Sequence, residues 1–230
     1  MIKCEVADRL ARIAFARAGE GNAFTGDMIR QLRDAVRDCD GRADILTLAG
    51  EGADFTLGRD RKEPMSAPPP DAFSLITDLN ESLSGFRGIV ISAVRGRAFG
   101  LGVGLVMRSD LAIASEEAVF ALDEVKLGIP PMFVMAAIVD HMTPKRALDV
   151  VLTSREFTAK EALEIGLLSR VVPASELDAR VEKLLDELHA RDREVLRACK
   201  RYLHAVKNMP VEARSAYALI EQTRFALRPR

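Results

Sequence analysis

Four glycines lie close together in the middle of the chain, at Gly96, Gly100, Gly102 and Gly104. An apolar run at 89–94 precedes them, and Leu105-Val106-Met107 follows. This order predicts a buried strand, a tight turn and the start of a helix. Glycine lets other groups approach its backbone N–H closely, and a helix N-terminus adds unpaired N–H donors and a positive dipole end. The segment is therefore suited to holding negative charge, either a phosphate or an oxygen that becomes negative during a reaction.

Two other segments carry groups that could act together with this turn. Residues 50–60, GEGADFTLGRD, follow a short apolar run at 45–49, and residues 120–131, FALDEVKLGIPP, contain the adjacent acids Asp123 and Glu124. Each segment alone is a weak signal, because a glycine after a strand is usually only a turn and an isolated glutamate is usually a solvated surface acid. Their order between residues 50 and 131 is more specific.

Strands that alternate with helices are predicted for the first half of the chain. Polar–apolar alternation at 2–16 and apolar runs at 45–49, 89–94 and 111–114 indicate strands. Helices are expected at 27–36, where apolar residues share one face, and at 72–83. Residues 64–70 contain four prolines and predict a loop. This alternation implies crossover connections and a largely parallel core sheet.

The second half of the chain is predicted to be mainly helical. Thr143-Pro144 is a typical helix start, and Thr158 with Glu161 forms a capping box. Gly166 suits the end of that helix, and a long amphipathic stretch begins at Ser175. These signals favour a helical region after residue 142.

Composition argues against several classes of protein. The chain has 230 residues with a formal net charge of -1, 48% hydrophobic and 29% charged residues, which suits one soluble globular domain, or one domain plus a helical tail. Near-neutral charge gives no general attraction to nucleic acid or an anionic membrane, and no apolar stretch is long enough to span a bilayer. Three widely spaced cysteines and three histidines fit neither a disulfide framework nor a metal site. We therefore expect a cytoplasmic protein without a bound metal.

Two other kinds of site that use glycine turns do not fit the spacing. A serine hydrolase of the common type has a Gly-x-Ser-x-Gly elbow, which this chain lacks. The run Gly100-Leu101-Gly102-Val103-Gly104 matches neither the GxGxxG of dinucleotide-binding folds nor the Gly-Lys-Ser/Thr of a P-loop. We discard both interpretations.

Taken together, the segments resemble the crotonase, or enoyl-CoA hydratase/isomerase, family from about residue 5 to residue 190. The resemblance is carried by Asn22-Ala23-Phe24, Phe55-x-x-Gly58-x-Asp60, Gly96-x-Ala98-x-Gly100-x-Gly102, Asp110, Phe120, Glu124, Leu127-Gly128-Ile129-Pro130, Leu152-Thr153, Ala159, Ala162 and Gly166-Leu167. It implies an α/β fold, with a crotonase-like spiral of ββα units over residues 1–142 and a C-terminal helical oligomerisation region over 143–230. It also implies a homotrimer or hexamer and an acyl-CoA substrate, of which coenzyme A is a part and not a separate cofactor.

The resemblance assigns an oxyanion hole to the backbone N–H groups of Arg59 and Leu101. One such donor typically contributes ~3 kcal/mol to transition-state stabilisation. The family usually has a small residue at position 59 and glycine at position 101, so a Leu101 backbone forced out of the required geometry would leave the hole unformed. Contacts with CoA or the acyl group are expected from Gly58, Asp60, Lys62, Gly100 and Phe133.

The resemblance also implies which reaction is catalysed. Family hydratases use two glutamates, whereas this chain has Gly104 at the first position and keeps only Glu124 at the second. Hydration needs one group to activate water and another to deliver a proton. A single carboxylate therefore favours Δ3,Δ2-enoyl-CoA isomerisation, in which Glu124 moves a proton from C2 to C4. The neighbouring Asp123 is expected to be a capping or salt-bridged acid.

Two alternatives stay open. A hydratase or C–C lyase of the same family could recruit Asp123 or Glu63 in place of the missing glutamate. A non-catalytic CoA-binding or assembly subunit would also be consistent with Leu101, with Gly104 and with a C-terminal segment shorter than is usual in the family.

Overall fold

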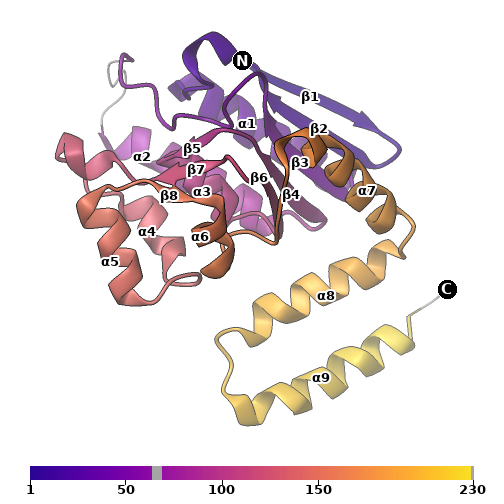
Figure 1. The fold of residues 1–230 in the computed structure, drawn as a ribbon. Coiled ribbons are helices and arrows are strands. Elements are labelled where there is room, and N and C mark those ends of the chain that lie inside the picture. The colour runs from indigo at the N-terminus through magenta and orange to yellow at the C-terminus, as the bar shows by residue number, and fades with distance from the viewer. Residues whose placement is uncertain (64–68, 229–230) are drawn as a thin grey trace.

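The N-terminal segment folds into an antiparallel hairpin at the edge of the main sheet. In a computed structural model, which describes residues 1–63 and 69–228, β1 (Ile2–Ala7) pairs with β2 (Leu10–Phe15). Asp8 and Arg9 connect the two strands with φ of 47° and 62°, the left-handed pair that a tight two-residue hairpin turn requires. The hairpin places β2 beside the parallel strands of the sheet (Figure 1).

Four strands continue this sheet parallel to β2, in the order β1-β2-β3-β4-β6-β9. They are β3 (Ile45–Gly50), β4 (Ile89–Val94), β6 (Leu111–Ser115) and β9 (Arg170–Val172). The strands predicted at 45–49, 89–94 and 111–114 are therefore confirmed. The largely parallel sheet expected from the alternation of elements is confirmed as well.

Helices surround the sheet and form the end of the chain (Figure 1). In chain order they are α1 (Gly26–Cys39), α2 (Pro69–Gly85), α3 (Leu101–Met107), α4 (Met132–Ile138), α5 (Pro144–Thr153), α6 (Ala159–Glu164), α7 (Leu177–His189), α8 (Arg193–Val206) and α9 (Val211–Ala226), with 3-10 turns at Ala18–Glu20, Glu124–Leu127 and Ala174–Glu176. The capping residue expected at Thr158 is present, since its Oγ1 accepts a hydrogen bond from Glu161 N at 3.2 Å.

The central strands β3, β4 and β6 are buried on both faces, which explains why they are nearly continuous apolar runs. Side chains alternate between the faces along each strand. Leu46 and Val90 belong to the larger core together with α1 and α2. Ile45 and Ile91 face the other way and pack against α7.

A second, three-stranded sheet holds the glycine-rich turn. Its order is β5 (Arg97–Phe99), β7 (Val119–Ala121) and β8 (Phe157–Thr158). β5 leads through Gly100 directly into α3, whose residues 102–107 are buried. The predicted order of strand, turn and helix is confirmed, with one additional short strand before the turn.

Both sheets include strands that lie beyond residue 142, where the predicted core ends. β8 pairs with β7 and β9 pairs with β6, so the segment 143–172 completes both sheets. Strands of two or three residues are too short for alternation to be visible in a sequence. The exclusively helical part begins later, near α7. The loop predicted at 64–70 lies partly outside the described residues, and α2 begins within it at Pro69, because proline is compatible with a first helical turn.

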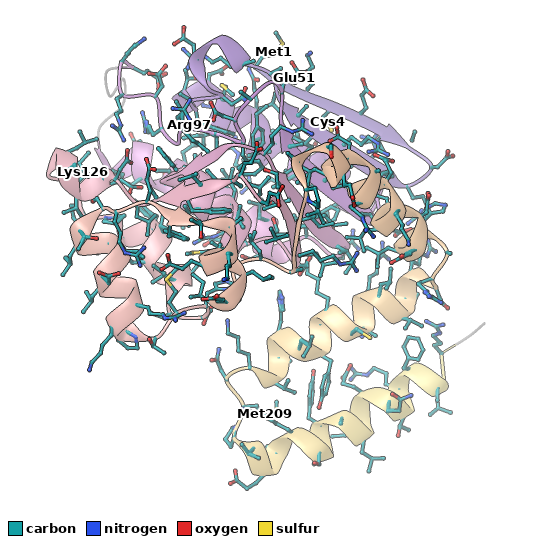
Figure 2. All side chains as sticks on the ribbon, in the orientation of Figure 1. Met1, Cys4, Glu51, Arg97, Lys126 and Met209 are labelled. Carbon is teal, nitrogen blue, oxygen red and sulfur yellow. The ribbon has the colours of Figure 1, made fainter. Side chains whose placement is uncertain are left out.

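Helices α8 and α9 lie side by side next to the body of the molecule (Figure 1). α8 is attached by a largely buried ion pair, in which Lys200 Nζ lies 2.7 Å from Asp110 Oδ2. α9 packs against α8, with the rings of Tyr202 and Tyr217 stacked at 5.7 Å. Figure 2 shows Met209, in the turn between these helices, well apart from the sheets. None of the helices in the described residues combines the length and apolar character needed to cross a membrane.

Candidate active site

A buried asparagine holds the loop that follows β3. Asn22 is fully buried and donates from Nδ2 to the carbonyls of Glu51 at 2.9 Å and Asp54 at 2.8 Å. Its own backbone carbonyl accepts a hydrogen bond from Thr56 Oγ1 at 2.7 Å. Because these bonds satisfy polar groups that water cannot reach, they fix one path for the loop.

A charged pair joins this loop to the glycine-rich turn. Asp54 accepts hydrogen bonds from Arg97 Nε at 2.8 Å and Nη2 at 2.7 Å, and the Arg97 guanidinium lowers the pKa of the Asp54 carboxyl. Arg97, labelled in Figure 2, is the first residue of β5. Thr56 N donates to the carbonyl of Arg97 at 3.0 Å, and Phe99 N donates to the carbonyl of Thr56 at 2.9 Å. The two loops assigned to the oxyanion hole are therefore fastened to each other.

The backbone N–H of Arg59 is turned away from its neighbouring strand. Phe24 N donates to the carbonyl of Gly58 at 2.8 Å, and Asp60 N donates to the carbonyl of Phe24 at 2.8 Å. Successive N–H groups alternate in direction along an extended chain, so the N–H of Arg59 points to the other side. Within residues 1–63 and 69–228 this N–H has no acceptor.

The N–H of Leu101 is the first of helix α3. Gly100, just before it, has φ of 49° and ψ of -110°, a conformation that glycine tolerates and other residues avoid. Gly100 therefore absorbs the sharp turn, and Leu101 keeps a helical backbone. An N–H at this position has no partner within its helix, and no other acceptor for it lies in the described part of the chain. The leucine side chain at this position is therefore compatible with a regular helix start.

Gly58 allows these two amides to come together. It has φ of +81°, and a Cβ at this position would lie 2.8 Å from the Phe99 carbonyl oxygen and 3.5 Å from Leu101 N. The first distance is too short for any side chain, so the close approach of the two loops depends on glycine. Arg59 follows Gly58 immediately in the chain, so the close approach of the two loops brings Arg59 near Leu101.

The carboxylate of Glu124 lies directly over Gly100. A Cβ on Gly100 would be 2.7 Å from Glu124 Oε1. Glu124 Oε2 is buried without a hydrogen-bond partner among the described residues. Burial raises the pKa of the Glu124 carboxyl; its own backbone N–H lowers it, the Asp123 carboxylate raises it and the Arg61 guanidinium lowers it. A partly desolvated carboxylate without a partner is suited to accept a proton.

The other acids considered for catalysis already have partners. Asp123 forms an ion pair with Arg61, in line with the salt-bridged role expected for it. Glu63 Oε2 accepts a hydrogen bond from Gly26 N at 2.7 Å, at the start of α1. In the part of the chain that the structure describes, no three His, Cys, Asp or Glu side chains gather in a way that could hold a metal ion.

The residues predicted to contact CoA occupy different settings. Lys62 is exposed on the loop after position 59. Asp60 is buried, pairs with Arg17 at 2.6 Å and accepts a hydrogen bond from Lys62 N at 2.8 Å, so it holds the loop in shape. Phe133 lies in α4 and packs against Phe73 of α2, with ring centroids 5.5 Å apart.

Sequence reasoning missed one charged residue close to this site. Arg108 follows α3, and its Nη1 donates to the carbonyl of Gly104 at 3.1 Å. A Cβ on Gly104 would lie 3.6 Å from this nitrogen. The only signal in the sequence is the spacing of four residues, which places positions 104 and 108 on one side of a helix.

Comparison with known proteins identifies the family. Residues 5–225 match the family described as Enoyl-CoA hydratase/isomerase. A probable mitochondrial enoyl-CoA hydratase of Dictyostelium discoideum is 32% identical over 78% of this chain and 66% of its own length. A hydroxycinnamoyl-CoA hydratase-lyase of Pseudomonas fluorescens is 28% identical over 97% of this chain and 86% of its own length. The chain belongs to the enoyl-CoA hydratase/isomerase family.

Solved structures share the fold. A putative enoyl-CoA hydratase from Thermobifida fusca YX, in complex with CoA, has a TM-score of 0.89 at 28% identity, covering 98% of this chain and 93% of that one. An enoyl-CoA hydratase from Mycobacterium smegmatis has a TM-score of 0.92 at 24% identity, covering 99% and 91%. The predicted crotonase fold is confirmed, and the protein is an enzyme of a family that acts on CoA thioesters.

Proposed function

We propose that this enzyme is a Δ3,Δ2-enoyl-CoA isomerase in which Glu124 moves the proton. The observation that carries the proposal is the buried carboxylate of Glu124, which lies over the turn before Leu101. Among the described residues, Glu124 Oε2 has no hydrogen-bond partner and the Leu101 N–H has no acceptor. Position 104, where a family hydratase has its other glutamate, is glycine. Isomerisation requires only one group that takes a proton from one carbon and returns it to another.

In the proposed reaction, the thioester carbonyl oxygen lies between the N–H groups of Arg59 and Leu101. Glu124 removes a proton from C2 of a 3-enoyl thioester, and the electron pair of that C–H bond moves toward the carbonyl oxygen. The resulting dienolate oxygen accepts hydrogen bonds from both amides, which stabilise it more strongly than the ground-state carbonyl. Glu124 then returns the proton at C4, and the double bond ends between C2 and C3. The proton balance closes without another reactant.

The environment of the site supports this assignment. Burial raises the pKa of the Glu124 carboxyl, which makes it a stronger base than a surface carboxylate. Gly58 and Gly100 permit close approach of the thioester to the two amides. We assign Lys62, exposed on its loop, to the CoA phosphates and Phe133 to the side of the acyl group.

Turnover of two thioesters tests the proposal. We expect the purified protein to convert 3-hexenoyl-CoA to its conjugated 2-enoyl isomer, measured by the rise in enoyl absorbance. We expect no comparable hydration of crotonyl-CoA. Efficient hydration with no isomerisation would favour the alternative of a hydratase or C–C lyase, the activities named for the relatives above. Binding of acyl-CoA without either turnover would indicate a non-catalytic CoA-binding subunit.

We also propose that the chain assembles as a homotrimer or hexamer through its C-terminal helices. Helix α9 exposes Leu219 and Ile220, apolar side chains that a second subunit could cover. A solution mass equal to one chain at micromolar concentration would contradict this assembly. The cytoplasmic location expected from the cysteine content stays a prediction.

A further inference from the structure

Arg108 is held in an unusual setting for a cation. Its Nη1 donates to the carbonyl of Gly104 at 3.1 Å, and its Nη2 donates to the carbonyl of Phe133 in α4 at 3.0 Å. In residues 1–63 and 69–228 the side-chain hydrogen bonds of Arg108 are to these two carbonyls, and no carboxylate pairs with its guanidinium. Burial lowers the pKa of the Arg108 guanidinium, because its charge has lost water without gaining a counter-charge.

These two contacts leave several N–H donors of the Arg108 guanidinium free to bind a ligand. Arginine has five N–H donors in a planar fork, and two carbonyls leave most of them available. Among the described residues, Arg108 Nε has no hydrogen-bond partner. It is also not one of the fully buried polar atoms without a partner, so solvent can reach it. The two carbonyl bonds fix the plane of the fork in advance, which reduces the entropy lost when a ligand binds.

The position of Arg108 follows from the geometry of α3. Leu101 and Gly104 are three residues apart, about 4.5 Å along a helix axis at 1.5 Å per residue. A Cβ at Gly104 would meet Val134 Cγ2 at 3.5 Å and Arg108 Nη1 at 3.6 Å, so the cation borders the space that a side chain at position 104 would enter. Going along α3, the amide assigned to the thioester oxygen therefore comes first, and the cation lies one turn further on.

We propose that Arg108 is a specificity residue that binds a carboxylate at the far end of the acyl group, so that the preferred substrates are dicarboxylic acyl-CoA thioesters. The placement of the thioester rests on the proposed function. A carboxylate matches the planar fork of arginine with two parallel hydrogen bonds and supplies the missing counter-charge. The inference also gives a reason for glycine at 104. A glutamate there would pair with Arg108 and occupy the cation that the substrate needs.

A purely structural role for Arg108 makes a different prediction. As a clamp between α3 and α4, Arg108 would affect all acyl-CoA ligands alike, because its two carbonyl contacts do not depend on the acyl group. As a specificity residue, it would affect only ligands that carry a carboxylate. Saturated thioesters can distinguish the two roles by binding alone, because they have no double bond to isomerise.

The test compares adipyl-CoA with hexanoyl-CoA, which have six-carbon acyl chains and differ at the far end, by isothermal titration calorimetry. We expect the unmodified protein to bind adipyl-CoA more tightly. Arg108→Gln should weaken adipyl-CoA binding by roughly 10- to 100-fold, the effect of losing a charge-assisted hydrogen bond, and should change hexanoyl-CoA binding by less than about threefold. Arg87→Gln is the matched control, because Arg87 is an exposed arginine paired with Asp40.

A second variant tests the same cation by giving it a carboxylate partner from the protein itself. Gly104→Glu should place a carboxylate beside Arg108, since a side chain at 104 meets only ordinary contacts, and should abolish the preference for adipyl-CoA. Equal binding of the two thioesters by the unmodified protein would overturn the inference while leaving the proposed function intact. Equal weakening of both ligands in Arg108→Gln would also overturn it. If no acyl-CoA binds at all, the proposed function fails with it.

Discussion

Gly100 lies just before helix α3 and Gly104 lies within it, and the lack of a side chain matters for different reasons at the two positions. A Cβ on Gly100 would lie 2.7 Å from Glu124 Oε1, and its φ of 49° is one that side chains rarely adopt. A Cβ on Gly104 would meet nothing closer than 3.5 Å, and its φ lies outside the left-handed region. Gly100 is required by local geometry, whereas Gly104 leaves room that a side chain could fill.

This contrast separates two kinds of functional glycine. At Gly100, the absence of a side chain lets the chain turn and leaves room for the carboxylate of Glu124 over the turn before Leu101. At Gly104, the absence of a side chain leaves a space beside the Arg108 guanidinium. In the proposed reaction the first position bears on the chemical step, and in the proposed role of Arg108 the second bears on which acyl group is accepted. Substitutions at and around these positions therefore should have effects of very different size.

The largest effect is expected from removing the base. Glu124→Gln keeps the shape of the side chain but cannot accept the proton from C2, so we expect isomerase kcat to fall by at least ~100-fold. Affinity for acyl-CoA should change little, because the amides of Arg59 and Leu101 are unaffected. Steady-state assays with 3-hexenoyl-CoA measure kcat, and calorimetry with hexanoyl-CoA measures the affinity. Retained turnover in this variant would show that another group moves the proton.

A somewhat smaller loss is expected from Gly100→Ala. The new Cβ would displace the Glu124 carboxylate and would have to adopt φ of 49° with ψ of -110°. A displacement of about 1 Å at a catalytic group can cost up to ~100-fold in rate, so we expect a 10- to 100-fold lower kcat. The backbone strain should also lower the free energy of unfolding by about 1–3 kcal/mol. A variant that matches the original enzyme in both rate and chemical denaturation would show that the turn is less constrained than its geometry indicates.

The sequence predicted the local structure around these two glycines but not the long-range contacts that they make, and the reason is physical. Strand–turn–helix order around Gly100 is a local pattern, and the main strands were foreseeable because buried parallel strands are continuous apolar runs. The contacts that define the site are not local. Glu124 follows β7 and lies against Gly100, which follows the neighbouring strand β5, and Arg108 donates to the carbonyl of Phe133 in another helix. Spacing along the chain does not reveal such contacts.

The same limit applies away from the site. Cys4 and Cys39 are far apart in the sequence and fit no disulfide pattern, yet their sulfurs lie 3.6 Å apart where β1 meets the end of α1. β8 and β9 were missed because strands of two or three residues carry no visible period. The family resemblance predicted that the backbone N–H groups of Arg59 and Leu101 form the oxyanion hole. Only the folded chain shows that Gly100 bears the strained conformation and that Leu101 has a helical backbone.

Arg61→Gln is expected to have a smaller effect than the two variants above. This effect should be visible as a shift in the pH dependence of kcat/KM. The base must be ionised, so kcat/KM falls as the pH drops through the pKa of Glu124, which burial raises above the usual carboxyl value. The Arg61 guanidinium favours the ionised form, and it also pairs with Asp123, whose charge disfavours that form. Removing Arg61 should therefore raise the pKa further and move the acidic limb of the profile to higher pH. A limb that moves to lower pH would contradict this arrangement of charges.

The smallest effect, and the one that tests the contrast most directly, is expected from Gly104→Ala. A methyl group at this position makes ordinary contacts of 3.5 Å and 3.6 Å and needs no unusual backbone angle. Alanine restricts the unfolded chain and favours the helix, so it should stabilise the protein by about 0.5–1 kcal/mol. For a chain of this size, that corresponds to a rise in Tm of roughly 1–4 °C, measured by calorimetry. Gly100→Ala, at the residue just before the same helix, is the matched control and should lower Tm. If both variants lower it, the space beside Gly104 is not available to a side chain, and the contrast between the two glycines is lost.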